Sequence, residues 1–170
     1  MSYVHLQVHS QYSISDSLVR LPQLVDAAKT GGMQSLALTD DSNLYAAVKF
    51  YKACTGVGIK PIIGADVRVS VSQADNKKGR LTVLCRNNAG YHFLCGLLTR
   101  AYLKRQIQSA ISVEDKELLH GANDLIVLCG ANDSYLGQLI QSEQLGKAHD
   151  LLCQYREAFT DNNFYMELAR

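Results

Sequence analysis

The sequence predicts an α/β fold, and three observations support this. Short β-rich runs alternate with amphipathic helical runs along the whole chain. With 170 residues, 47% of them hydrophobic, the chain can bury the core of one ordinary domain. No Pro-rich linker, internal repeat or low-complexity stretch divides it. Alternating strands and helices predict a mostly parallel sheet with right-handed crossovers, either doubly wound or closed into a barrel.

The N-terminal run "YVHLQVH", residues 3–9, alternates apolar and polar side chains. This period of two predicts a strand, because successive side chains of a strand point to opposite faces. His5, Gln7 and His9 would then share one face. We expect that face to be functional, since two histidines and an amide would project from it together.

The next three elements are a helix, a strand and a second helix. Pro22 opens the first helix, and the pair Gly31–Gly32 closes it. The run "SLALTD", residues 35–40, is a buried strand. Ser42 or Asn43 is expected to cap the second helix. Its predicted apolar stripe consists of Leu44, Ala47, Val48 and Tyr51, and Gly56 and Gly58 end it.

The remaining elements follow the same alternation. A polar turn at 72–79 separates two β-rich runs, which predicts two successive strands. The full prediction is strands at 60–71 and 80–86, a helix from Tyr91 to about Lys104, a loop at 106–112, a short helix at 113–122, a strand at 124–130, one or two helices over 135–158, and a final strand at 162–170.

Charge and cysteine content limit the classes of partner. The net charge of +1 gives no general attraction to a phosphate backbone, so any nucleic-acid contact would have to be local. The cysteines are isolated and form no CxxC pair, which is typical of a reducing compartment. The chain has neither an apolar run of ~20 residues, as a membrane span needs, nor a signal-peptide pattern. We therefore expect a cytoplasmic protein without membrane contact.

Polar side chains gather at the carboxyl ends of the predicted strands. They are His9, Asp40, Asp41, Asp66 and Glu167. Imidazole and carboxylate are common ligands of divalent metal ions, and parallel α/β folds build their sites at this edge. A second interpretation is equally available, because an alternating strand exposes polar residues anyway and Asp-Asp-Ser-Asn is also a capping and turn sequence. Spacing alone leaves both interpretations open.

Four segments, in this order and spacing, resemble the N-terminal PHP (polymerase and histidinol phosphatase) domain of the α subunit of bacterial DNA polymerase III: "VHLQVHSQYSISDS", "ALTDDSNLYAAVKFYKACTGVGIKPIIGADV", "LTVLCRNNAGYHFLCGLLTRAY" and "DLIVLCG". The most specific are "IKPIIGADV" and "NNAGY". The resemblance implies a distorted, TIM-like (β/α) barrel with helices outside. In active members, a cluster of His, Asp and Glu at the carboxyl ends of the barrel strands binds up to three metal ions for phosphoester or 3′-5′ exonuclease chemistry.

The first family motif departs from the pattern of active members. Active members begin with His-x-His, and here that pair falls on Gln7 and His9, while His5 lies outside the motif. A Gln carbonyl is a poor substitute for imidazole on a catalytic divalent ion. The carboxylate that follows matches Asp16, but the usual Gly after it is Ser17.

The later motifs depart as well. Where active members carry Asp-His-Gly, this chain has Asp40, Asp41 and a serine, so a second imidazole is lost. A usual Glu is shortened to Asp66, and a frequent His aligns with Arg80, a cation that would repel a metal. We therefore interpret the cluster as the remains of a metal site. Its residues are His9, Asp16, Asp40, Asp41 and Asp66, with Gln7, Asp41 and Arg80 at replaced ligand positions.

The resemblance also implies a larger context. Residues 1–170 match the N-terminal part of the PHP domain, so we expect an incomplete barrel that lacks its later strands and the polymerase domains. The parent subunit would be a DNA-directed DNA polymerase, a nucleotidyltransferase of DNA replication. The domain itself would be an inactive scaffold that supports the rest of the α subunit, docks the proofreading exonuclease (epsilon) subunit and meets other replicase subunits. DNA would be contacted only through the parent subunit.

Two enzymatic alternatives remain. One is a residual metal-dependent phosphoesterase or 3′-5′ exonuclease, with Asp41 as a carboxylate ligand favouring Mg²⁺ or Mn²⁺ over Zn²⁺. The other is a stand-alone hydrolase of the histidinol-phosphatase kind, against which the polymerase-like segments argue. If the site holds no metal, its converging carboxylates should repel one another unless Arg80 or a lysine supplies a counter-charge. No resident cofactor is expected in the scaffold interpretation.

Overall fold

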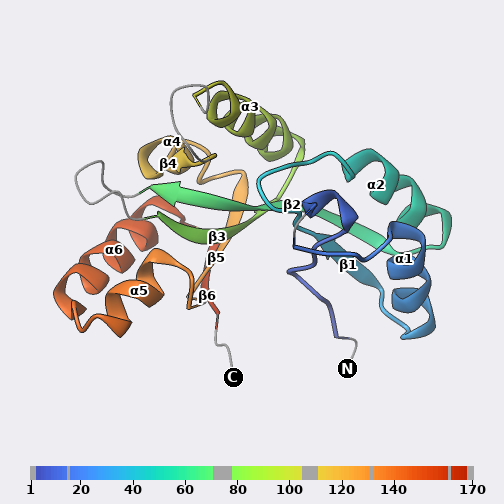
Figure 1. The fold of residues 1–170 in the computed structure, drawn as a ribbon, viewed down its shortest axis with the longest axis horizontal. Helices are drawn as coiled ribbons and strands as arrows, with labels where there is room; N and C mark the ends of the chain where they lie inside the picture. The colour runs from blue at the N-terminus through green and yellow to red at the C-terminus, as the bar shows by residue number, and fades with distance from the viewer. Residues whose placement is uncertain are drawn as a thin grey trace. The chain divides into compact units, whose positions relative to one another are not determined.

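The computed structural model describes residues 3–14, 16–70, 78–104, 111–130, 132–160 and 162–167. The chain forms two compact units, residues 1–66 and 67–170. The boundary between the units falls inside one strand, β2 (Lys60–Ser70). Figure 1 labels the elements of both units.

The first unit contains two helices beside a short parallel pair of strands. Its elements are η1 (Gln11–Ser13), α1 (Leu21–Thr30), β1 (Ser35–Leu38), α2 (Ala47–Gly56) and the first part of β2. β1 pairs with β2 in parallel, from Ser35 opposite Lys60 to Leu38 opposite Ile63. α1 and α2 lie side by side (Figure 1). An isolated bridge between Asp41 and Asp66 continues the pairing beyond β1.

The core of the first unit follows from the apolar spacing of its elements. Pro22 occupies the first turn of α1, as predicted, and Val25 and Ala28 face inward one turn apart. Gly58, with a φ of +81°, follows the end of α2 in a conformation that favours glycine. The buried cluster consists of Leu21, Val25, Ala28, Leu36, Leu38, Ala46, Phe50, Cys54 and Ile59.

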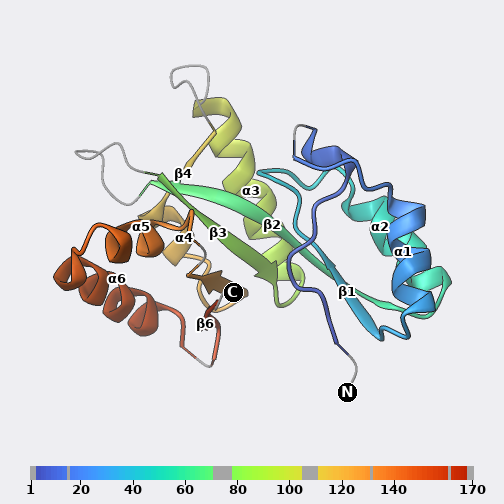
Figure 2. The same cartoon turned by 60° about the horizontal axis from the view of Figure 1, so that its bottom comes forward.

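The predicted N-terminal strand is wrong. Residues 3–10 form no strand, although they run beside β1 (Figure 2), where Ala37 N donates to His5 O at 3.0 Å and Thr39 N to Val8 O at 2.8 Å. The N–H of Val8 bonds to the hydroxyl of Thr39 at 3.0 Å instead of a backbone carbonyl. A side chain therefore takes the place of a ladder bond, and no regular pairing forms.

The predicted cap and buried face of α2 are also wrong. The helix begins at Ala47 without a side-chain cap, because Asn43 instead closes a turn before it, accepting a hydrogen bond from Tyr45 N at 3.1 Å. Ala47, Phe50 and Cys54 face the core, whereas Val48 is 60% exposed and Tyr51 56% exposed. Leu44 precedes the helix and so does not set its buried face.

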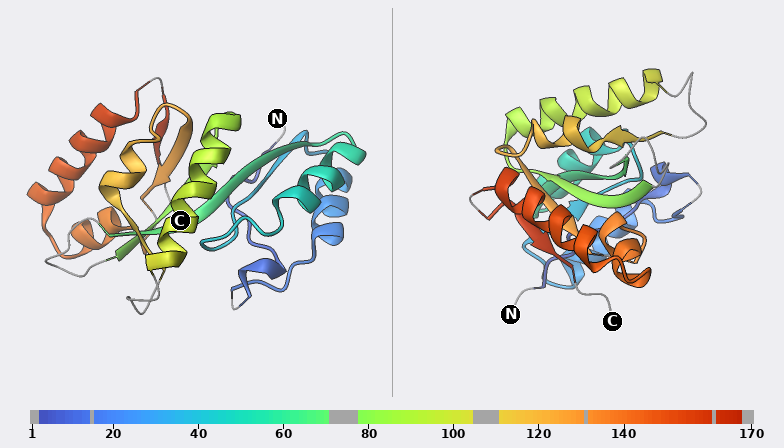
Figure 3. Two further views of the ribbon diagram at one scale, coloured as in Figure 1. Left: turned by 90° about the horizontal axis from the view of Figure 1, so that it is seen from above. Right: turned by 90° about the vertical axis from the view of Figure 1, so that its left-hand side faces the viewer.

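The second unit contains the remaining elements. They are β3 (Lys78–Cys85), α3 (Asn88–Lys104), β4 (Val113–Glu114), α4 (Asp115–Leu119), β5 (Leu125–Cys129), α5 (Tyr135–Gln141), α6 (Leu145–Ala158) and β6 (Phe164–Met166). The end of β2 pairs with β4 in parallel, and β5 pairs with β6 in parallel. α5 and α6 lie side by side (Figure 3). The predicted short helix at 113–122 is divided into β4 and α4.

One strand pair departs from the predicted parallel arrangement. β3 and β5 are antiparallel, from Thr82 opposite Leu128 to Cys85 opposite Leu125. Only residues 71–77 separate β2 from β3, which is too short for the crossover of about a dozen residues that a parallel return requires. β3 therefore runs against its neighbours. The predicted turn at 72–79 and loop at 106–112 lie mostly outside the described residues.

The prediction of an α/β class is confirmed. The described strands are paired mostly in parallel, and in neither unit do they close on themselves, as an incomplete barrel requires. Within the described ranges, no helix is both long and apolar enough to cross a membrane.

A buried carboxylate ties α4 to α6 in the second unit. Asp115 is 4% exposed; Tyr155 Oη donates to its Oδ1 at 2.6 Å and Gln154 Nε2 to its Oδ2 at 3.2 Å. Burial raises the pKa of Asp115, and these two hydrogen bonds offset only part of that rise.

This raised pKa predicts a specific pH dependence of stability. The folded chain binds the proton of Asp115 more tightly than the unfolded chain, whose Asp has a pKa of about 3.9. The contribution of Asp115 to stability is therefore full below that pH and is lost as pH rises through the folded pKa. Asp115→Asn should reduce the fall in unfolding free energy as pH rises. Urea unfolding at several pH values measures this fall. The exposed Asp26→Asn is the control, and an unchanged pH profile for Asp115→Asn would contradict the prediction.

Candidate functional site

The candidate site lies entirely within the first unit, where the N-terminal segment meets the ends of β1 and β2. Gln7 and His9 come from the segment before η1, and Asp16 comes from the loop after it. Asp40 and Asp41 follow β1, and Asp66 lies in β2. The Asp41–Asp66 bridge holds the two strand ends in register.

His9 lies at the centre of a chain of hydrogen bonds. Its Nδ1 is 2.6 Å from Asp16 Oδ2 and its Nε2 is 2.7 Å from Asp66 Oδ2. Gln7 Nε2 donates to the same Asp66 oxygen at 2.8 Å. Asp66 is fully buried, whereas the Asp16 side chain is half exposed. One imidazole and one amide therefore bond to the same oxygen of a fully buried carboxylate.

The two carboxylates favour the protonated form of His9. The hydrogen bond that Asp66 accepts raises the pKa of His9 most strongly, partial burial opposes this rise, and Asp16 adds to it. Protonation makes both ring nitrogens donors, which matches the two short contacts. A protonated His9 places a positive charge beside Asp16 and Asp66, where the sequence suggested Arg80 or a lysine as one source of counter-charge.

Asp40 turns its carboxylate into the backbone turn of η1. Its Oδ1 accepts from Ser10 N at 2.6 Å, Ser10 Oγ at 3.0 Å and Ser13 Oγ at 2.7 Å. Its Oδ2 accepts from Ser10 Oγ at 2.8 Å. Asp40 is 2% exposed, so these donors replace water around a buried charge. The carboxylate thereby fixes residues 10–13 against the end of β1.

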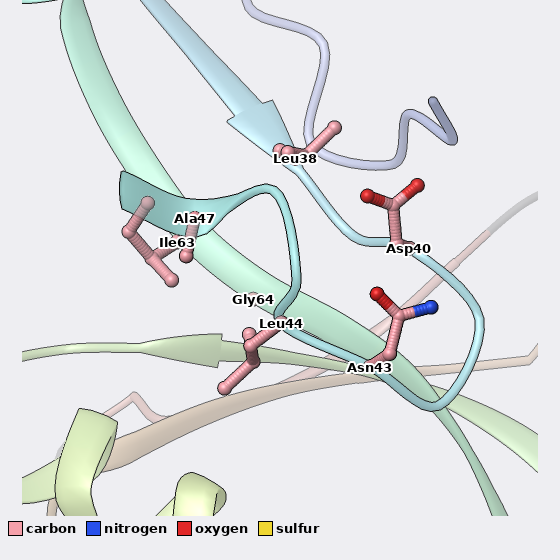
Figure 4. Close-up of a pocket in the computed structure, with 7 residues that line it drawn as sticks. All are labelled: Leu38, Asp40, Asn43, Leu44, Ala47, Ile63 and Gly64. Carbon is pink, nitrogen blue, oxygen red and sulfur yellow. The ribbon is translucent and has the colours of Figure 1, made fainter. Parts of the chain in front are cut away.

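A small cavity lies on the other side of Asp40. Figure 4 shows the Asp40 carboxylate pointing away from Ile63 and Ala47, which line the cavity with Leu38, Asn43, Leu44 and Gly64. Its volume of about 10 Å³ is close to what one water molecule requires. A space of this size holds no substrate.

Asp41 and Arg80 each make contacts of their own within their units. The Asp41 carboxylate accepts from Ser42 Oγ at 3.1 Å, and Asp41 N donates to Ser13 Oγ at 3.0 Å. Arg80 belongs to the second unit, where its Nε is 2.7 Å from Asp133 Oδ2. Glu167 also belongs to the second unit, and its N–H donates to Cys129 O at 2.7 Å.

These side chains, as arranged, do not fit the metal centre that active relatives of the resembled family carry. Both ring nitrogens of His9 are directed at carboxylates, and Gln7 presents an N–H rather than an oxygen. The oxygens of Asp40 are occupied by backbone and hydroxyl donors. A ligand must offer a lone pair to a metal, and neither a protonated imidazole nor an amide N–H offers one.

Sequence reasoning missed the hydroxyl residues that hold the site together. Ser10 caps η1, accepting from Tyr12 N at 3.2 Å, and Ser17 Oγ donates to His9 O at 2.8 Å. Thr39 fixes Val8, as described above. The signal was present in "HSQYSISDS", because short hydroxyl side chains in a run without period are typical of caps and turns.

Known proteins provide an independent comparison. The DNA polymerase III subunit alpha of Pseudomonas aeruginosa is 36% identical over 170 residues, covering 100% of this chain and 14% of its own length. That of Escherichia coli K12 is 38% identical over 169 residues, covering 99% and 14%. This chain therefore spans about one seventh of those relatives.

One solved structure overlaps more weakly. An amidohydrolase from Chromobacterium violaceum, with bound sulfate and no metal, is 24% identical and covers 60% of this chain and 34% of its own, with a TM-score of 0.48. An overlap this partial supports no conclusion about chemistry. The PHP domain profile, in contrast, matches residues 5–170. The chain belongs to the PHP domain family.

Proposed function

We propose that this chain is the PHP domain of a replicative DNA polymerase III α subunit and that its own role is structural. The names and identities of the relatives support the first part of the proposal. The hydrogen-bonded His9 cluster supports the second, because its side chains tie the N-terminal segment and the loop after η1 to β2 through contacts with one another. Template-directed DNA synthesis then belongs to the parent subunit, in the cytoplasm.

The partners follow from the same proposal. The domain would support the rest of the α subunit, and other replicase subunits would assemble with it. We further propose that it docks the proofreading exonuclease (epsilon) subunit. The near-neutral net charge suits a surface that mainly meets protein, because it provides no general pull on a phosphate backbone.

A second candidate is a residual metal-dependent phosphoesterase or 3′-5′ exonuclease. The observation that favours it is that His9, Asp16 and Asp66 do meet within hydrogen-bond distance. For that activity, a divalent ion such as Mn²⁺, Mg²⁺ or Zn²⁺ would have to displace the hydrogen bonds among them. The structural role requires no such exchange.

Metal analysis separates the two candidates. The full chain is dialysed against Mn²⁺ or Zn²⁺, then assayed for bound metal and for hydrolysis of p-nitrophenyl phosphate esters. We expect far less than one equivalent of metal, no turnover, and an unfolding midpoint in urea that chelator does not change. Stoichiometric metal, with turnover that His9→Ala abolishes, would instead establish the phosphoesterase. The exposed His149→Ala is the matched control.

A further inference from the structure

Residues 42–60 form a locally basic stretch in a chain of almost balanced charge. The stretch contains Lys49, Lys52 and Lys60 and no Asp or Glu, whereas the whole chain has a net charge of +1. The helix α2 lies within it and carries Lys49 and Lys52, both exposed. The helix itself therefore carries two positive side chains and no negative one.

The same helix exposes aromatic side chains. Tyr45, just before the helix, is 61% exposed, and Tyr51 is 56% exposed. With 3.6 residues per turn, Lys52 lies on the side opposite the buried Phe50 and Cys54. Val48 and Lys49, one turn before Lys52, flank it on that outer side, and Tyr45 lies just before the helix. We call the group Tyr12, Tyr45, Val48, Lys49, Tyr51 and Lys52 the α2 outer face.

Lys49 is already held beside an aromatic ring. Its Nζ is 2.7 Å from Tyr12 Oη and 5.3 Å from the centre of the Tyr12 ring. Tyr12 is in η1, and Asn43 Nδ2 donates to its backbone carbonyl at 3.0 Å, so the backbone that carries this ring is tied to the loop before α2. The charge of Lys49 and the ring of Tyr12 therefore already lie together in the folded chain.

We propose that the α2 outer face binds single-stranded nucleic acid. Exposed tyrosine rings stack with bases that are not paired, and lysines placed between them neutralise the phosphates. A duplex hides the base faces, so the tyrosines favour a single strand. A protein partner fits less well, because lysine is depleted from the centres of protein interfaces. The proposal goes beyond the scaffold role, since it gives this domain a nucleic-acid contact of its own, and it stands or falls separately from metal binding.

A matched pair of charge variants tests the proposal on the full chain. Fluorescence anisotropy of a short labelled oligothymidylate measures binding at low salt. Each neutralised phosphate contributes a slope of about −0.7 to log K against log salt, so Lys49 and Lys52 give about −1.4. Lys49→Gln/Lys52→Gln should remove most of that salt dependence. The control, Lys116→Gln/Lys147→Gln, makes the same charge change at exposed positions of the second unit and should bind as the unchanged chain does.

A tyrosine variant tests the stacking. Tyr45→Ser/Tyr51→Ser should weaken binding by about thirtyfold or more and leave the salt slope unchanged, because the lysines remain. Circular dichroism checks that both double variants are folded, as their exposed positions imply. Equal binding by the Lys49/Lys52 variant and its control would overturn the proposal. So would equal affinity for duplex and single strand, or sedimentation evidence that this face instead joins two copies of the chain.

Discussion

Asp40→Ala is expected to lower the free energy of unfolding by about 3 kcal/mol, since hydrogen bonds to a buried charged group contribute about 1.5–3 kcal/mol each and the lost carboxylate leaves its donors without partners. Ser10 N, Ser10 Oγ and Ser13 Oγ all donate to this side chain. The hydroxyls can rotate to other acceptors, but the backbone N–H of Ser10 cannot. Urea unfolding followed by circular dichroism measures the change.

Two variants make the result specific. Asp40→Asn keeps one acceptor oxygen, so its free energy of unfolding should lie between those of the wild type and Asp40→Ala. Asp26→Ala removes an exposed carboxylate on α1 and should stay within about 0.5 kcal/mol of the wild type. A loss of under about 1 kcal/mol for Asp40→Ala would show that the η1 turn does not depend on this carboxylate.

Elements with a strong local signal could be predicted from the sequence. Pro22 lies in the first turn of helix α1, and the pair Gly31–Gly32 follows its last residue, as expected. The apolar runs of β2 and β5 are buried strands. The N-terminal segment has the alternation of a strand, but a hydroxyl 31 residues away takes one of its ladder bonds. No local pattern contains that competition, so sequence reasoning could not detect it.

The structure brings together some of the residues named from the sequence, through contacts that the sequence did not indicate. His9 and Asp66 were both named from the sequence, and they meet across a separation of 57 residues. What periodicity could not indicate is which of these groups lie within hydrogen-bond distance of one another. Gln7 also brings an N–H to Asp66, at a position where active relatives of the resembled family carry an imidazole.

Two glycines of α3 should respond to the same substitution with opposite signs. A Cβ at Gly90 would overlap the backbone carbonyl oxygen of Asp124. That oxygen also accepts from Arg86 N at 2.9 Å, just beyond β3, so it cannot move without breaking this bond. Gly90→Ala should therefore destabilise the chain by about 3 kcal/mol, at the upper end of ordinary overpacking costs.

Gly96, two turns further along α3, is the matched control. A Cβ there meets only the Arg100 Nη1 atom, at 3.3 Å, which is the end of a flexible side chain. Gly96→Ala should stabilise the chain by about 0.5–1 kcal/mol, because alanine loses less backbone entropy in a helix than glycine does. Urea midpoints of both variants measure the contrast. Destabilisation by both would mean that helix α3 tolerates no added side chain, whereas stabilisation by both would mean that the end of α3 is not packed on Asp124.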